Sequence, residues 1–207
     1  MGKLYFKYGT MGSSKTAQAL MTKFNYEQKG FKVILLKPVV DNRDIVGEKI
    51  VVKSRIGLYA DCLTFNKDVN LITFINDNKP NKDFIVIVDE CQFLTKKQVE
   101  QLKKVSRTNN VLCYGLLTNF KTELFEGSKR LVEISDSLQE IKSVCSCGKK
   151  ANVNARFING EIVLDGAEIL IGADETYESL CFNCYENKIS KAKKLQKITK
   201  LKNTIKN

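Results

Sequence analysis

The sequence contains no histidine among its 207 residues. This absence excludes catalysis by Ser-His-Asp or Cys-His groups, so a general base must be a carboxylate or a lysine. The sequence also lacks an apolar run of the roughly 18 residues that a membrane span requires, and its longest clear run is Phe84–Val88. No apolar segment near the start ends at a small-residue cleavage site. We therefore expect a cytoplasmic protein with no membrane partner.

Cysteine is present at seven positions, and four of these form two close pairs, Cys145 with Cys147 and Cys181 with Cys184. In a reducing compartment, paired cysteines bind metal more often than they form disulfides. Thiolates this close in sequence can converge on one tetrahedral zinc, so we interpret the four residues as zinc ligands. The remaining three stand alone, and we interpret them as small buried hydrophobic residues: Cys62, Cys91 and Cys113.

The formal net charge is +11, but most of it lies at one end of the chain. From Glu186 onward, eight lysines stand against one glutamate, which supplies +7 of the total. We interpret residues 188–207 as a basic, solvated and disordered tail. The alternative is an arm that attracts RNA or another anion.

The first 140 residues alternate between strand-like and helix-like segments. The apolar patterns predict strands at 3–8, 33–36, 84–88 and 111–117, and helices at 16–29, 67–78 and 96–105. This alternation predicts an α/β domain over 1–140, with a P-loop parallel sheet flanked by helices. Residues 39–59 are polar, and we expect a mobile loop with at most a short strand at 49–53. Glycines and short apolar runs then predict a small zinc-binding β subdomain over 141–187.

A glycine-bearing loop lies between the first predicted strand and helix, and it ends in Lys15-Thr16. Loop amides and the positive helix end can face phosphate oxygens, the lysine can reach the β- and γ-phosphates, and the threonine hydroxyl can ligate Mg²⁺. The strict pattern has glycine where this chain has Ser14, which is acceptable if its φ is negative. A loop that only caps a helix is the alternative. The predicted nucleotide-binding residues are Gly9, Thr10, Met11, Gly12, Ser13, Ser14, Lys15 and Thr16.

Two carboxylates, Asp89 and Glu90, follow the most apolar predicted strand. Ligands bind at this end of the strands in open α/β sheets. Asp89 is placed to hold Mg²⁺, and Glu90 is then free to accept a proton. A solvated acidic pair is the alternative.

Taken together, these motifs resemble the thymidine kinase family of the cytosolic, zinc-containing, tetrameric type. The resemblance spans about residues 3 to 187. The segments that carry it are Gly9–Thr16, Asp89-Glu-Cys-Gln-Phe93, Gly115-Leu-Leu-Thr-Asn-Phe-Lys-Thr-Glu-Leu-Phe125, Cys145-Ser-Cys-Gly148, and Ile171-Gly-Ala-Asp-Glu-Thr-Tyr177 before Cys181. Asn119 departs from the pattern, because the family usually has aspartate there.

The resemblance implies phosphate transfer from ATP to the 5′-hydroxyl of thymidine, and of deoxyuridine, with Mg²⁺, a structural Zn²⁺ and a homotetramer. It assigns Glu90 as the general base and places Asp89 and Gln92 on the nucleotide and magnesium side, with Asp41 and Arg43 as a further ATP-contacting pair. It assigns a lasso loop over the nucleoside to residues 168–172. The implied substrate-binding residues are Met11, Phe93, Leu116, Phe120, Phe125, Glu168, Ile169, Leu170, Ile171, Gly172 and Tyr177.

Two other functions compete with a nucleoside kinase. A zinc protein that binds nucleic acid through the lysine tail is disfavoured, because the cysteine pairs lack interleaved exposed aromatic residues and arginine. A P-loop ATPase with another acceptor, such as water, stays open.

Overall fold

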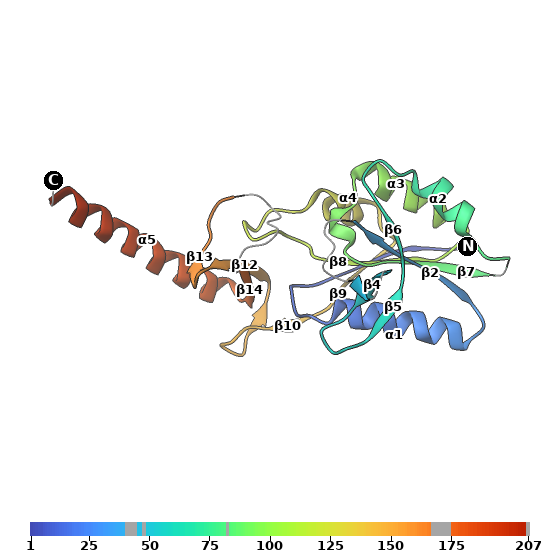
Figure 1. Ribbon diagram of the computed structural model, residues 1–207, viewed down its shortest axis with the longest axis horizontal. Helices are drawn as coiled ribbons and strands as arrows, with labels where there is room; N and C mark the ends of the chain where they lie inside the picture. The colour runs from blue at the N-terminus through green and yellow to red at the C-terminus, as the bar shows by residue number, and fades with distance from the viewer. Residues whose placement is uncertain (40–44, 47–48, 82, 167–174, 206–207) are drawn as a thin grey trace. The chain divides into compact units, whose positions relative to one another are not determined.

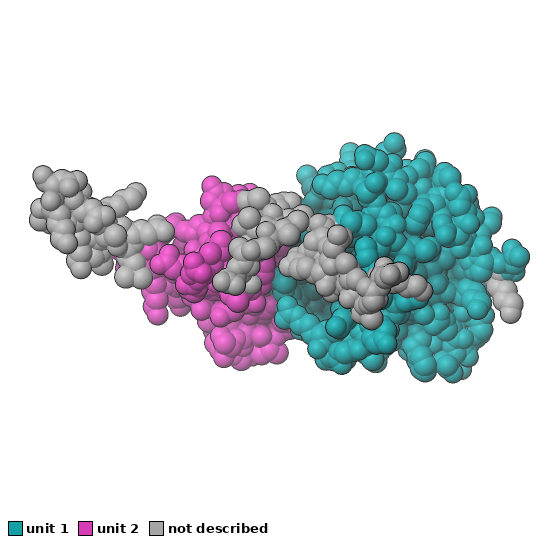
Figure 2. All heavy atoms as spheres, viewed as in Figure 1, with its two compact units in different colours: residues 1–117, 124–141 teal, residues 118–123, 142–207 magenta. Residues whose placement is uncertain are grey.

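The structure is a computed structural model that describes residues 1–39, 45–46, 49–81, 83–166 and 175–205. Its helices and strands are labelled in Figure 1. The chain forms two compact units, which Figure 2 colours separately: unit 1 comprises residues 1–117 and 124–141, and unit 2 comprises 118–123 and 142–207. Residues 118–123, which the sequence analysis places in the first domain, therefore cluster with unit 2.

Unit 1 is built on a six-stranded sheet in which every recorded pair of neighbours is parallel. The strand order is β6-β2-β7-β8-β1-β9. This parallel sheet confirms the predicted α/β class. Its central strands are continuous apolar runs, as expected for strands that are buried on both faces. The strands are β1 (Leu4–Tyr8), β2 (Lys32–Pro38), β6 (Leu63–Phe65), β7 (Phe84–Val88), β8 (Val111–Gly115) and β9 (Ser137–Glu140).

Helices cover both faces of this sheet, with α1 on one face and α2, α3 and α4 on the other (Figure 1). Alternate residues of β7 point to opposite faces, so Val86 and Val88 join one core and Ile85 and Ile87 the other. The sheet is therefore held from both sides. The helices are α1 (Lys15–Gln28), α2 (Leu71–Asn78), α3 (Lys96–Val105) and α4 (Glu126–Ile134).

The predicted strand at 84–88 and helix at 96–105 have the observed bounds. The helix predicted from residue 67 begins only at Leu71, because the Asn70 side chain caps it and accepts hydrogen bonds from the N–H groups of Ile72 and Thr73. Helix α4 and the edge strands β6 and β9 were not predicted.

An antiparallel ribbon lies between β2 and β6 in sequence. It comprises β3 (Ile45–Val46), β4 (Lys49–Lys53) and β5 (Tyr59–Asp61). The short strand predicted at 49–53 is present. The loop expected over the rest of 39–59 is wrong at residues 45–46 and 59, because these residues pair with that strand. Val51 and Val52 are buried, which explains why the ribbon packs onto unit 1.

Unit 2 contains a three-stranded antiparallel sheet, β13-β12-β14, and a two-stranded ribbon, β10-β11. A long helix, α5 (Phe182–Ile205), follows, so the structure is helical where we expected a disordered tail. The stretch has no glycine or proline and is rich in lysine, leucine and isoleucine, which permits a helix. The strands are β10 (Ser143–Val144), β11 (Lys150–Ala151), β12 (Val153–Ile158), β13 (Glu161–Ile162) and β14 (Glu175–Leu180). Among the described residues, no helix is long and apolar enough to cross a membrane.

Candidate functional site

The predicted phosphate loop lies between the end of β1 and the start of α1. Its residues Met11, Gly12 and Ser14 line a cleft of about 180 Å³ together with Lys15 and Thr16 at the beginning of the helix. Gly9 precedes them where no side chain fits, since a Cβ there would lie 2.4 Å from the Ile141 carbonyl oxygen. The close approach of the loop to the end of β9 therefore requires glycine at position 9.

Ser14 adopts the left-handed conformation, with φ 65° and ψ 24°. The condition under which we considered serine acceptable at this position, a negative φ, is therefore not met. A non-glycine residue in this region carries about 1–2 kcal/mol of strain. Gly12 also has a positive φ, of 74°, so two residues of the loop adopt positive φ values before the helix begins. Ser14 keeps the backbone that the usual glycine would adopt, and it makes no side-chain capping bond to α1.

Lys15 is folded back onto this loop. Its Nζ donates a hydrogen bond of 2.8 Å to the Thr10 carbonyl oxygen and one of 3.5 Å to Ser13 Oγ. Burial lowers the pKa of the Lys15 ammonium, and the carboxylates of Glu90 and Asp89 oppose that effect. A buried ammonium of this kind is ready to exchange a carbonyl partner for an anion such as phosphate.

Thr16 and Asp89 join the loop to the end of β7. The Thr16 hydroxyl donates a hydrogen bond of 3.0 Å to Asp89 Oδ2. Burial raises the pKa of the Asp89 carboxyl to about 7, with a further contribution from the charge of Glu90, while the Thr16 bond acts in the opposite direction. A hydroxyl and a carboxylate in contact are hard oxygen donors, and they fit Mg²⁺.

Glu90 also lines the cleft, and a neighbouring amide orients its carboxylate. Gln92 Nε2 donates to Glu90 Oε2 at 2.5 Å, while Gln92 Oε1 accepts a bond of 3.0 Å from the Leu116 N–H. The second bond fixes which end of the amide faces Glu90. Gln92 therefore contacts Glu90, the predicted base, and its role toward the nucleotide stays a prediction. Glu90 has a positive φ of 53°, a strained conformation of the kind that clusters at functional sites.

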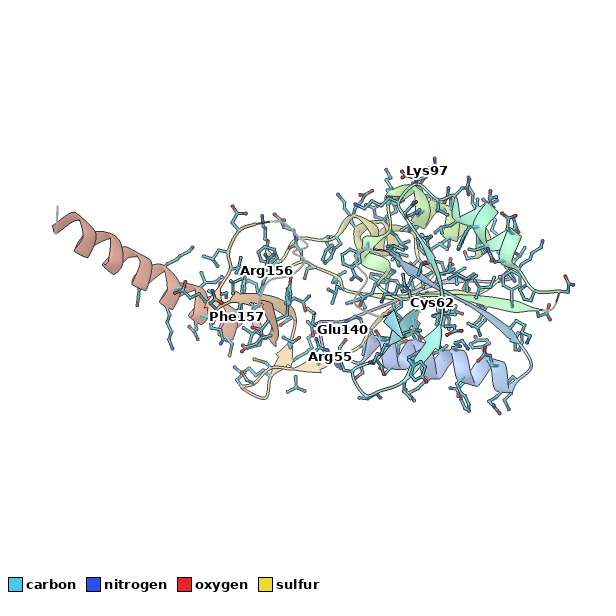
Figure 3. The ribbon with its side chains drawn as sticks, in the orientation of Figure 1. Arg55, Cys62, Lys97, Glu140, Arg156 and Phe157 are labelled. Atoms are coloured by element: carbon cyan, nitrogen blue, oxygen red, sulfur yellow. The ribbon has the colours of Figure 1, made fainter. Side chains whose placement is uncertain are left out.

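The aromatic residues predicted to contact the nucleoside fall in both units. In unit 1, the rings of Phe93 and Phe125 meet edge to face with centroids 5.8 Å apart, and Leu116 lines the cleft. In unit 2, the Arg156 guanidinium lies 4.6 Å from the centroid of the buried Phe120 ring. Figure 3 labels Arg156 on β12. One face of Phe120 is thus already occupied.

Asn119, the departure from the family pattern, lies at the start of the turn 119–123 in unit 2. Its Oδ1 accepts hydrogen bonds from the N–H groups of Lys121 and Glu123. An aspartate could accept the same two bonds, so the turn does not require the usual residue. Of the other predicted residues, Tyr177 lies on β14, paired with Arg156. The rest lie outside the described residues: Asp41, Arg43, Glu168, Ile169, Leu170, Ile171 and Gly172.

The four paired cysteines come together in unit 2. The Sγ atoms of Cys145, Cys147, Cys181 and Cys184 all lie within 4.8 Å of one another, and those of Cys147 and Cys181 are 3.6 Å apart. Two come from the β10–β11 turn and two from the start of α5. Backbone hydrogen bonds lower the pKa of the Cys145 thiol to about 6, whereas thiol contacts raise that of Cys184 to about 12. Four converging sulfurs fit a zinc ion with no position left for water.

The sequence analysis missed one group of residues that line the cleft. They belong to the end of β4 and the turn that follows it: Lys53, Ser54, Arg55 and Ile56. A single arginine in a polar stretch has no periodic pattern or motif by which it could be identified. These residues reach the cleft only because β4 and β5 pair and place the turn between them there.

Comparison with known proteins identifies the family of this chain. The family model described as thymidine kinase matches residues 2–185. A thymidine kinase of Aliivibrio fischeri is 41% identical over 195 residues, which cover 92% of this chain and 100% of the relative. One of Haemophilus influenzae is 42% identical over 192 residues, covering 91% and 98%. Among solved structures, a DnaB-like replicative helicase is similar with a TM-score of 0.41 and 18% identity, covering 70% of this chain and 43% of its own. The chain belongs to the thymidine kinase family.

Proposed function

We propose that this protein transfers the γ-phosphate of ATP to the 5′-hydroxyl of thymidine, and of deoxyuridine, to give the nucleoside monophosphate. One observation carries the proposal: Lys15, Thr16 and Glu90 line the same cleft. Direct phosphate transfer requires the donor cradle and the base for the acceptor to share one space. Membership of the thymidine kinase family supports thymidine as the acceptor.

The phosphate loop and the Thr16–Asp89 pair form the donor side. In the proposed complex, Lys15 leaves the Thr10 carbonyl oxygen and binds the β- and γ-phosphates, while loop N–H groups surround the remaining oxygens. Thr16 Oγ1 and Asp89 would hold Mg²⁺. When bound, Mg²⁺ neutralises charge on the β- and γ-phosphate oxygens. A cation beside Asp89 also favours the ionised carboxylate, against the effect of burial.

Glu90 is the general base of the proposed reaction. Its carboxylate accepts the proton of the 5′-hydroxyl as the new phosphorus–oxygen bond forms. Gln92 holds the Glu90 carboxylate from one side, and the Leu116 N–H in turn holds Gln92, so the base is positioned before the nucleoside arrives. Positioning matters because catalysis of phosphate transfer depends largely on geometry and charge.

We propose that unit 1 contributes the apolar side chains near this base to the acceptor site. Met11 and Leu116 line the cleft, and Phe93 packs on Phe125. The resemblance to the family further assigns Phe120, Tyr177 and residues 168–172 to contacts with the nucleoside. The four cysteines would hold a structural zinc in the same unit as these residues. We also propose a homotetramer, on the resemblance to the family alone.

The decisive experiment measures ATP turnover with and without thymidine, and then repeats it with Glu90→Gln. Replacing the base by an isosteric amide should lower kcat by about 10²- to 10⁴-fold, the usual contribution of a general base. Binding of ATP and of thymidine should stay within a few-fold of the unmodified protein. Glu27→Gln, which removes an exposed carboxylate of α1, is the matched control.

Two results would contradict the proposal. ATP turnover that does not depend on thymidine would indicate an ATPase with another acceptor. Undiminished turnover by the Glu90→Gln protein would remove Glu90 from the reaction while leaving the family assignment intact.

A further inference from the structure

The β4–β5 hairpin carries a cation into the phosphate-loop cleft. Arg55 lies in the turn between the two strands and lines the cleft together with Gly12, Lys15 and Glu90. Figure 3 labels it in unit 1. The phosphate loop, the base and this arginine come from three separate segments of the chain, so their meeting at one cavity is a property of the fold.

The Arg55 side chain points toward the loop. Its Nη1 lies 3.9 Å from the position that a Cβ on Gly12 would occupy. Lys15 lines the same cleft, so the guanidinium and the ammonium face a common space. Within the described ranges of the chain, no hydrogen bond or ion pair engages the Arg55 guanidinium. Two cations that share a cleft in this way favour an anion between them.

The turn that presents Arg55 is well ordered by hydrogen bonds. The Ser54 N–H donates to the Leu58 carbonyl oxygen at 2.7 Å, the Leu58 N–H donates to Ser54 Oγ at 3.0 Å, and the Gly57 N–H donates to the Ser54 carbonyl oxygen at 3.1 Å. Ser54 itself is buried, and so are Val51 and Val52 on β4. Strand β4 and the first turn residue are therefore packed in unit 1, while Arg55 is exposed and accessible to a ligand.

We propose that Arg55 binds the γ-phosphate of ATP and stabilises the charge on the phosphoryl group during transfer. This inference rests on the proposed function. The γ-phosphate is the favoured contact because Glu90, the base for the acceptor, lines the same cavity as Arg55. The bond from the γ-phosphorus to the bridging oxygen of ADP breaks, a bond to the 5′-oxygen forms, and the hydroxyl proton passes to Glu90. Arg55 only donates hydrogen bonds, and guanidinium suits this task because two of its N–H groups can hold two phosphate oxygens.

The test compares Arg55→Ala and Arg55→Lys with Arg107→Ala, which removes an exposed arginine after α3 and serves as the control. We expect Arg55→Ala to lower kcat by about 10- to 100-fold, the size of one lost charge-assisted hydrogen bond, with the KM for thymidine within two-fold. Arg55→Lys should recover only part of the activity, because an ammonium cannot form the paired contact. Added guanidinium should partly restore Arg55→Ala, which a merely structural role would not allow.

The contact with the γ-phosphate is tested separately by binding. Arg55→Ala should weaken the affinity for ATP by at least five-fold more than that for ADP, measured by titration calorimetry. Equal weakening for both nucleotides, or a kcat within two-fold of the unmodified protein, would overturn the proposal. If the unmodified protein failed to phosphorylate thymidine, the proposed function would fail, but the comparison of ATP with ADP would still decide whether Arg55 binds the terminal phosphate.

Discussion

The two units position functional side chains by different physical means. In unit 1, buried clusters on both faces of a six-stranded sheet hold the strand ends and loops that form the cleft. In unit 2, the sheet has three strands, and the core cluster among the described residues has eight buried members, of which Cys145 and Cys181 are two. A sheet this small buries too little apolar area to order itself securely. Packing therefore organises the first unit, and we expect metal ligation at the four cysteines to organise the second.

The sites of the two units also differ in the charged groups that they contain. The cleft of unit 1 contains a partly buried lysine, Lys15, and a buried aspartate, Asp89. Burial lowers the pKa of the lysine and raises that of the aspartate, so both shifts favour the neutral form. The cysteine site gathers thiols that need a dication to ionise together. Both sites are therefore costly without their ligands, and we expect a metal at the second site also to support the fold around it.

The largest expected effect comes from removing the metal. Cys181→Ser, or extraction of zinc with a chelator, should disorder unit 2 and abolish thymidine binding, while ATP binding by unit 1 should stay within a few-fold of the unmodified protein. Elemental analysis for one zinc per chain, amide hydrogen exchange and separate titrations with the two substrates measure this. Cys62→Ser, a cysteine outside the cluster, is the control.

Equal loss of ATP and thymidine binding on zinc removal would break the comparison, since the two units would then depend on one another. Active protein without zinc would contradict the metal site itself.

An intermediate effect should appear in the pH dependence of stability of the nucleotide-free protein. Because the folded pKa of Asp89, about 7, exceeds its ordinary value of 3.8, the folded state binds this proton more tightly than the unfolded state. The contribution of Asp89 to the free energy of unfolding should therefore fall as the pH rises from about 4 to about 7, by about 4 kcal/mol at most. Asp89→Asn removes this penalty, so its advantage in stability should be larger at pH 8 than at pH 5.

Urea unfolding of both proteins at the two pH values measures this difference, with Asp77→Asn on an exposed position of α2 as the control. Parallel pH profiles for Asp89→Asn and the unmodified protein would mean that burial of Asp89 does not affect stability. The same variant should lose affinity for Mg·ATP, which would show that the cost of this carboxylate is tied to ligand binding.

The smallest expected effect concerns the strained loop. Ser14→Gly should raise the free energy of unfolding by about 0.5–1 kcal/mol, because the relief of left-handed strain exceeds the extra chain entropy of glycine. Ser13→Gly offers a matched contrast at the next position, where φ is not positive and the Oγ accepts from Lys15, so it should destabilise. Thermal unfolding compares the two, and destabilisation by Ser14→Gly would show that the serine side chain stabilises the loop.

Features that depend on apolar runs and local motifs could be predicted from the sequence. Strand β7 is a run of five apolar residues, and α3 has a clear apolar stripe, so both have their predicted bounds. Edge strand β9 escaped prediction because Ser137–Glu140 has one apolar residue and pairs on only one side. Helix α4 was missed as well, and it has a glycine in its first turn.

Site features that depend on the path of the backbone could not be predicted. The contact of Gln92 with Glu90 accompanies a positive φ at Glu90, and it is oriented by the Leu116 N–H, on another segment, which donates to Gln92 Oε1. The placement of Arg55 requires pairing between β4 and β5, which no local pattern signalled. The four cysteines, by contrast, could be grouped at once, because their chemistry and spacing define the site without the fold.

The hairpin that carries Arg55 is an insertion between two strands that are already neighbours, since β2 pairs directly with β6 through Leu36 and Leu63. Its length can therefore change without any shift in the register of the sheet. Donor preference could then diverge among relatives by exchange of this one appendage, while the scaffold beneath it is inherited intact.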